Sequence, residues 1–87
     1  MKKLRWDPQK SLWLKDHRGA LFEEIVQGEV VAIKSHPNRS HQNMMLFDFQ
    51  GYIWVVPYVE NDSELFLKTA YRSRKYTKQF MKGVLSS

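Results

Sequence analysis

The sequence has no cysteine, so it can form neither disulfide bonds nor thiolate metal sites, and it has no cysteine nucleophile. It lacks any apolar run near the ~18 residues of a membrane-spanning helix, and its basic start leads to Trp6-Asp7-Pro8 instead of a signal-peptide core. A chain of 87 residues without disulfide staples is expected to form one domain, residues 1–87, and suits a reducing compartment. These absences predict a soluble cytoplasmic protein that does not contact membranes.

Acidic residues are missing from residues 65–87, the basic segment, which nevertheless holds six of the 14 basic residues. Residues 1–64 carry eight basic and nine acidic side chains, so the basic segment generates the whole formal charge of +5. The segment also holds four aromatic residues: Phe66, Tyr71, Tyr76 and Phe80. A localised positive field with flat rings in it points to a partner that is a phosphate polyanion or an acidic protein.

The pattern of apolar residues and turn formers predicts a short first strand, two short helices, four further β-prone runs and a last helix. Asp7-Pro8 is a helix start, Gly19 a helix stop, and Gly28 ends the second helix. The strand-like runs are residues 3–6, 29–35, 44–49, 52–59 and 64–71. The expected fold class is α+β, with two N-terminal helices packed on a four-stranded, mainly antiparallel sheet and a C-terminal helix.

Two details of this plan can be checked against a structure. Pro57 cannot donate a ladder hydrogen bond, so it should lie at an edge position or a bulge. Ser73 is expected to cap the last helix, with Tyr76, Phe80 and, at the end, Val84 facing inward.

Three short blocks, in order along the chain, resemble one family. Residues 4–10 (LRWDPQK) resemble the F-x-W-D-x-x-K start of the BrnT toxin family. Residues 22–25 (FEEI) are similar to its S-F-E-E second helix, and residues 72–78 (RSRKYTK) to its S-A-R-K-A-T ending. Leu21 stands where the family motif has a helix-capping serine, and Tyr76 replaces a small residue.

The resemblance implies a RelE/ParE-like fold and the toxin half of a type II toxin–antitoxin module. It implies an endoribonuclease that inhibits translation and needs no metal or other cofactor. The partners that it implies are RNA and a cognate antitoxin, a DNA-binding protein with an acidic segment that covers the toxin.

Ribonucleases of this kind use the 2′-hydroxyl of the RNA as nucleophile. The protein must accept its proton, stabilise the phosphorane and protonate the leaving 5′-oxygen. The candidate catalytic residues are Lys68, Arg72 and Arg74; the candidate RNA- or phosphate-binding residues are Lys75, Tyr71, Tyr76 and Lys78. Because alternate residues of a strand share a face, Lys68 and Arg72 are expected on one face, about 13 Å apart.

Other interpretations stay open at this point. His36 and His41 flank a polar loop and could serve as acid or base, or could simply be exposed. No helix-spaced histidine pair or carboxylate cluster predicts a metal site. The basic segment could be a solvated surface or a non-catalytic module that binds nucleic acid or protein, and a RelE/ParE-like toxin could instead attack a protein target such as gyrase.

Overall fold

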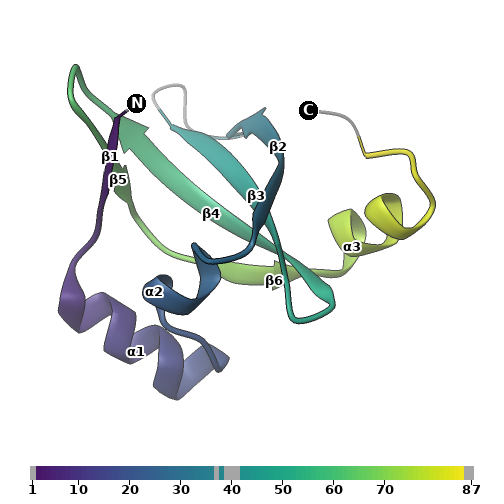
Figure 1. Ribbon diagram of the computed structural model, residues 1–87, viewed down its shortest axis with the longest axis horizontal. Helices are drawn as coiled ribbons and strands as arrows, with labels where there is room; N and C mark the ends of the chain where they lie inside the picture. Colours follow the sequence, from purple (N-terminus) through teal and green to yellow (C-terminus); the bar gives the residue numbers. More distant parts are fainter. Residues whose placement is uncertain (1, 37, 39–41, 86–87) are drawn as a thin grey trace.

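The computed structural model describes residues 2–36, 38 and 42–85, which contain three helices and six strands (Figure 1). In chain order these are β1 (Lys3–Arg5), α1 (Pro8–Arg18), α2 (Phe22–Ile25), β2 (Glu29–Ser35), β3 (Asn43–Phe49), β4 (Tyr52–Glu60), β5 (Glu64–Leu67), β6 (Tyr71–Ser73) and α3 (Arg74–Met81). The α+β class and the order of the helices agree with the sequence-based expectation. The number of strands in the sheet does not.

The sheet has six strands and is mixed, instead of four-stranded. Its order is β1-β5-β4-β3-β2, and β6 pairs with β4 beyond the end of β5. β1 runs parallel to β5, and the other pairings are antiparallel. Ion pairs of Lys2 with Glu60 and of Arg5 with Glu64 join the first strand to the sheet. The short N-terminal strand is thus a member of the sheet and not a separate lead-in.

The run expected as one strand over residues 64–71 is broken by a bulge. Tyr58 pairs with Leu67 and Val55 with Tyr71, so three steps along β4 face four steps along the partner stretch. The Pro57 carbonyl points toward the partner stretch, where it accepts a hydrogen bond from the Lys68 N–H at 2.8 Å. In a strand, the N–H and the carbonyl of one residue point to the same neighbouring strand. Because proline has no N–H, the second hydrogen bond of a regular pair cannot form here, and the regular pairing is interrupted. Pro57 was expected at an edge position or a bulge; it lies in the inner strand β4, in regular register with β3, and the bulge is in the partner stretch opposite it.

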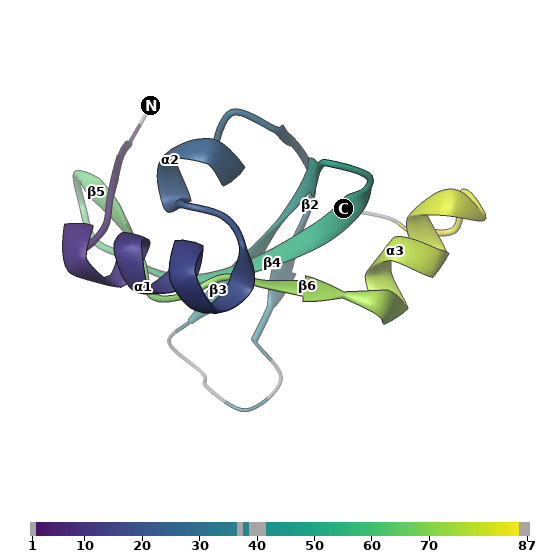
Figure 2. The same cartoon turned by 90° about the horizontal axis from the view of Figure 1, so that it is seen from below.

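The two faces of the sheet carry separate apolar clusters. The helix face packs against α1 and α2 through Phe47, Trp54, Val56 and other buried residues. The opposite face carries a smaller cluster of Ala32, Met44, Leu46, Ile53 and Val55. Figure 2 shows α1 and α2 together on one side and α3 set apart from them at the end of the sheet.

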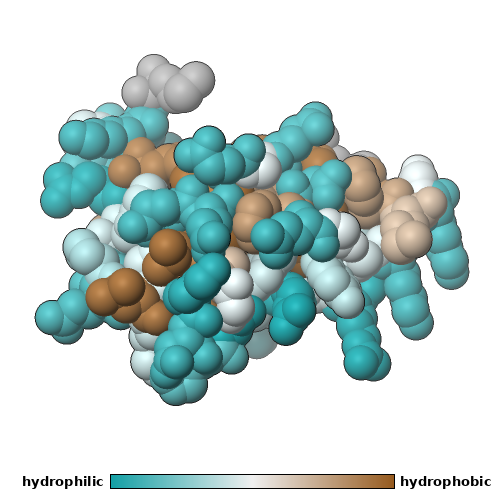
Figure 3. Space-filling view, turned by 60° about the horizontal axis from the view of Figure 1, so that its bottom comes forward, coloured by the Kyte–Doolittle hydropathy of each residue, from teal (hydrophilic) through white to brown (hydrophobic). Residues whose placement is uncertain are grey.

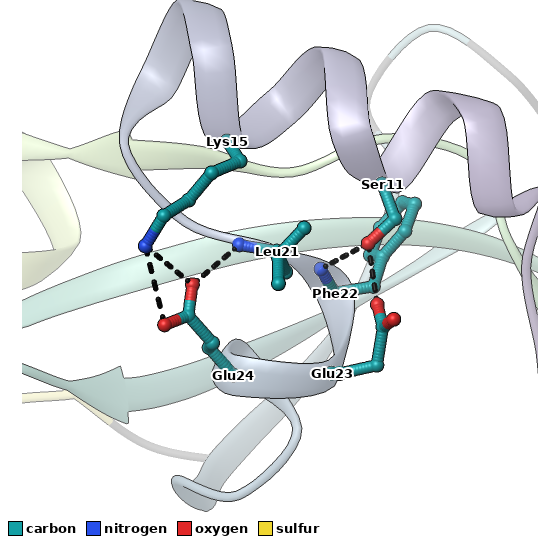
Figure 4. Close-up of polar contacts among 6 residues, drawn as sticks. All are labelled: Ser11, Lys15, Leu21, Phe22, Glu23 and Glu24. Carbon is teal, nitrogen blue, oxygen red and sulfur yellow. Dashed lines mark hydrogen bonds and ion pairs between the residues drawn. The ribbon is translucent and has the colours of Figure 1, made fainter.

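Hydrogen bonds join α1 to the start of α2 (Figure 4). The buried Ser11 hydroxyl accepts from the Phe22 N–H at 2.9 Å and donates to the Glu23 carboxylate. Leu21, the residue before α2, has no side-chain acceptor that could cap the helix. The Ser11 hydroxyl of α1 takes this role by accepting a hydrogen bond at the start of α2. The Glu24 carboxylate accepts from the Leu21 N–H at 2.8 Å. α2 is shorter than expected and ends at Ile25.

Glu24 should make the stability of the protein depend on acidity. The hydrogen bond from the Leu21 N–H, followed by Lys15, lowers the pKa of Glu24 from its ordinary 4.5. A carboxyl with a lowered pKa in the folded state stabilises that state above pH 4.5, and this contribution disappears as the pH falls through the folded value. We expect the stability difference between the parent and Glu24→Gln to be constant near neutrality and to shrink below pH 4.5, as measured by urea unfolding. An equal difference at neutral and strongly acidic pH would contradict this role.

α3 begins as expected and ends differently. The Ser73 hydroxyl accepts from the Tyr76 N–H at 3.1 Å, and Tyr76 packs against the apolar cluster of the opposite face. Phe80 is 40% exposed and Val84 64% exposed. Val84 was expected to face inward, and this is wrong because the helix ends at Met81 and Gly83, with φ 74°, turns the chain. Leu85 packs against the opposite-face cluster instead.

Candidate nucleic-acid interface

The bulge places Lys68 and Arg72 on different faces of the sheet. Cross-strand partners point to the same face, and Arg72 pairs with Trp54 of the helix face. Tyr71 pairs with Val55 of the opposite face, and Lys68 lies beside Pro57 on that same face. The expectation that Lys68 and Arg72 share a face is therefore wrong, because the extra residue in the bulge reverses the alternation.

On the opposite face, three of the predicted site residues line one hollow of about 330 Å³: His36, Lys68 and Tyr71. We call it the His36–Lys68–Tyr71 hollow; Gln42, Pro57 and Thr69 complete its lining. His36 follows β2 and Gln42 precedes β3, while Lys68 and Thr69 belong to the bulge. Residues from four segments of the chain thus converge there. His41 lies outside the described residues.

Hydrogen bonding sets the proton positions in this hollow. The Asn38 N–H donates to His36 Nδ1 at 3.1 Å, so the neutral ring carries its proton on Nε2 and can donate it. Partial burial, and then the neighbouring Tyr76, raise the pKa of the Tyr71 hydroxyl above its ordinary 10.0. This hydroxyl stays protonated at neutral pH and is a hydrogen-bond donor. With the Lys68 ammonium, the hollow presents donors suited to a phosphate.

Arg72 and Arg74 line a second hollow of about 280 Å³ together with Tyr52. The Arg72 guanidinium carbon lies 5.4 Å from the centre of the Tyr52 ring and 5.7 Å from that of Trp54. Stacking on these rings orients the guanidinium while leaving Arg72 exposed. Tyr52 was not among the residues predicted from the sequence, because only the β4–β6 register brings it near Arg72.

Arg18 is a second residue that sequence reasoning missed. Its guanidinium Nη1 donates to the Ala70 carbonyl at 2.7 Å and to the Thr69 hydroxyl at 3.2 Å. It thereby ties the end of α1 to the bulge that lies between the two hollows. A lone arginine at a helix end carries no sequence signal for a contact 52 residues away.

The remaining predicted cations are on α3. Lys75 and Lys78 are exposed, and the Lys75 ammonium lies 5.4 Å from the centre of the Tyr76 ring. Figure 3 shows long hydrophilic side chains projecting from the end of the molecule where α3 lies. The ion pairs found in the described residues involve Lys2, Arg5, Lys15 and His17, and none involves a cation of the basic segment. This end of the protein therefore keeps its positive field.

Two further searches bear on partners. Among the described residues, no three His, Asp or Glu side chains form a group that could hold a metal ion. No helix in the described part of the chain is long and apolar enough to cross a membrane.

The architecture is a small α+β fold with a mixed six-stranded sheet. It is similar to the crystal structure of the Brucella abortus ribonuclease toxin BrnT, with a TM-score of 0.57 over 84% of this chain and 97% of that chain. The sequence identity is 19%. No family model and no curated protein matches the sequence. The resemblance to BrnT that the sequence motifs indicated is thus confirmed in the fold.

Proposed function

We propose that this protein is the toxin of a type II toxin–antitoxin module and an endoribonuclease. The observation that carries the proposal is the His36–Lys68–Tyr71 hollow, which gathers phosphate-binding donors in a fold shared with a ribonuclease toxin. Its place on the sheet face away from α1 and α2 leaves it open to a polymer.

The proposed reaction is attack of the RNA 2′-oxygen on the adjacent phosphorus with departure of the 5′-oxygen. His36 Nε2–H and the Tyr71 hydroxyl donate to phosphate oxygens, and the Lys68 ammonium stabilises the phosphorane. Water in the open hollow, in place of the protein base expected from the sequence, accepts the proton of the 2′-hydroxyl. Lys68 protonates the leaving 5′-oxygen and then takes up a proton from solvent. The products are a 2′,3′-cyclic phosphate and a 5′-hydroxyl, and no metal takes part.

Arg72 and Arg74 have a different role in this proposal. They lie with Tyr52 on the other side of β6, which pairs with β4 alone among the described strands. RNA crossing this free edge would meet both hollows in succession. We assign Arg72 and Arg74 to holding a neighbouring phosphate, and Lys75 and Lys78 to attracting the strand, with the Tyr76 ring beside the Lys75 ammonium.

The test uses purified protein and a labelled RNA oligonucleotide in the presence of EDTA. We expect cleavage that yields a 2′,3′-cyclic phosphate and that is lost when the nucleotide at the cleaved position is a 2′-deoxynucleotide. Expression without the antitoxin should arrest growth and degrade RNA. Arrest with intact RNA would favour a protein target such as gyrase, and RNA binding without cleavage or arrest would favour a non-catalytic module.

A further inference from the structure

The last helix has an apolar side that the rest of the protein leaves largely uncovered. No residue of α3 is buried, although its sequence is strongly amphipathic. Met81 is 79% exposed, and Phe80 and Val84 are also exposed. Exposed apolar side chains that lie together, here on a short helix and the turn after it, mark an interaction surface more often than scattered ones do.

A hollow of about 290 Å³ lies between α3 and the β3–β4 hairpin. Its apolar lining comes from Tyr52, Ile53, Phe80 and Met81, and the acidic residue Asp48 also lines it. Thr77 fixes the helix beside it, because the Thr77 hydroxyl accepts from the Ile53 N–H at 2.9 Å. The hollow therefore has walls held in place by backbone contacts and can receive an apolar side chain.

A stripe of cations runs beside this apolar surface. Arg74, Lys78 and Lys82 follow one another at intervals of four residues, which places them along one side of the helix. All three are exposed, and the ion pairs of the described residues include none of them. The surface thus combines apolar anchoring positions with a row of unneutralised positive charge.

We propose that α3 and its hollow dock an acidic amphipathic helix of a partner protein, which, resting on the proposed function, is the antitoxin. Its glutamates or aspartates pair with the stripe formed by Arg74, Lys78 and Lys82. One of its large apolar side chains fills the hollow beside Phe80 and Met81. A helix is the matching shape, because it repeats acids every four residues next to an apolar face.

The same features argue against a polyanion or a lipid surface as the occupant. Phosphates of RNA would pair with the cations but would leave Met81 and Val84 exposed to water. An anionic membrane would cover the apolar residues but would bring its charge against Asp48 in the hollow. An acidic helix satisfies both the apolar residues and the cations, and a basic or hydroxyl group on it can meet Asp48.

Docking at this surface would also inhibit the enzyme directly. Arg74 belongs both to the cation stripe and to the hollow that it shares with Arg72 and Tyr52. An acidic partner on α3 would neutralise part of the field that attracts RNA and would occupy one of its phosphate contacts.

The experiment measures binding of a synthetic helical peptide of about 18 residues, or five turns, with a leucine face flanked by glutamates. Binding to the full-length protein is followed by calorimetry, with methionine methyl NMR to locate the contact. We expect Met81→Gln, which removes the apolar contact without adding charge, and Lys82→Glu each to weaken binding by about tenfold or more. The matched controls Leu12→Gln, at an exposed apolar residue of α1, and Lys3→Glu, at an exposed cation of β1, should bind as the parent does.

Further measurements distinguish an acidic helix from RNA and from a lipid surface as the ligand of α3. A peptide with lysine in place of glutamate should not bind. Met81→Gln should leave the affinity for a uridine oligonucleotide and for phosphatidylglycerol–phosphatidylcholine vesicles unchanged. No binding of the acidic peptide by the parent, equal binding by all variants, or loss of RNA or vesicle binding in Met81→Gln would overturn the proposal. Because Met81→Gln should still cleave RNA, a protein that binds the peptide without cleaving RNA would contradict the enzyme and not the docking surface.

Discussion

Replacing Lys68 with alanine is expected to lower the turnover of RNA cleavage by about two to three orders of magnitude, with the fold unchanged. Lys68 is the only side chain with a fixed positive charge among the described residues that line the His36–Lys68–Tyr71 hollow. Loss of one donor to the transition-state charge costs about 10²–10³ in turnover in other enzymes. The side chain is exposed, so its removal leaves no buried cavity.

Arg72→Ala should behave differently, because Arg72 lies on the helix face with Tyr52 and Trp54. We expect KM to rise by about tenfold with turnover nearly kept, as befits a contact to a neighbouring phosphate. Lys34→Ala is the matched control for Lys68→Ala, since Lys34 pairs with Met44 of the opposite face but lies outside the hollow. Equal losses in Lys68→Ala and Lys34→Ala, or a larger fall in turnover in Arg72→Ala than in Lys68→Ala, would refute the assignment.

The contrast between Lys68 and Arg72 shows where sequence reasoning about this fold stops. Local signals worked: Asp7 and Ser73 cap their helices, Gly19 ends α1 in the left-handed conformation, and Pro57 faces a bulge. These outcomes depend on one residue and its immediate neighbours. Which face of the sheet a side chain after the bulge points to depends instead on the number of residues in the bulge. That number is set by the pairing with β4.

The residues near the candidate site that were not predicted from the sequence are placed there by long-range contacts. Tyr52 joins Arg72 only through the β4–β6 register, and Arg18 reaches the bulge across the fold. His36 and Lys68 were both candidates, but their meeting in one hollow requires the end of β2 and the start of β3 to lie beside the bulge. Candidate residues could therefore be named from the sequence, but which of them lie together could not be predicted.

The positive charge of the basic segment is divided by the fold among three places. Lys68 faces the candidate catalytic hollow, Arg72 lies on the helix face, and Lys78 and Lys82 border the apolar surface of α3. In the two proposals above, different cations of this one continuous run bind RNA and an acidic partner. Arg74, at the start of α3, is common to the last two surfaces.

Gly28→Ala is expected to destabilise the protein by about 3 kcal/mol, more than any glycine replacement at a position with free space. Gly28 was expected to end the second helix, but its structural importance is a close approach of two backbone segments. A Cβ built on Gly28 would lie 2.5 Å from the carbonyl oxygen of Asp48 and 3.2 Å from that of Ile25. Neither oxygen belongs to a flexible side chain, so relief requires the α2–β2 connection to move away from β3.

Such a movement would act on the sheet where β2 begins, because Glu29 pairs with Asp48. For a domain of this size the cost corresponds to a fall in Tm of roughly 10–20 °C, measurable by circular dichroism. Gly19→Ala is the control: Gly19 has φ 90° and nothing within 4 Å of a built Cβ, so only conformational strain of about 1 kcal/mol applies. If Gly28→Ala melts at or above the temperature of Gly19→Ala, the backbone at Asp48 yields freely and the close approach does not constrain the fold.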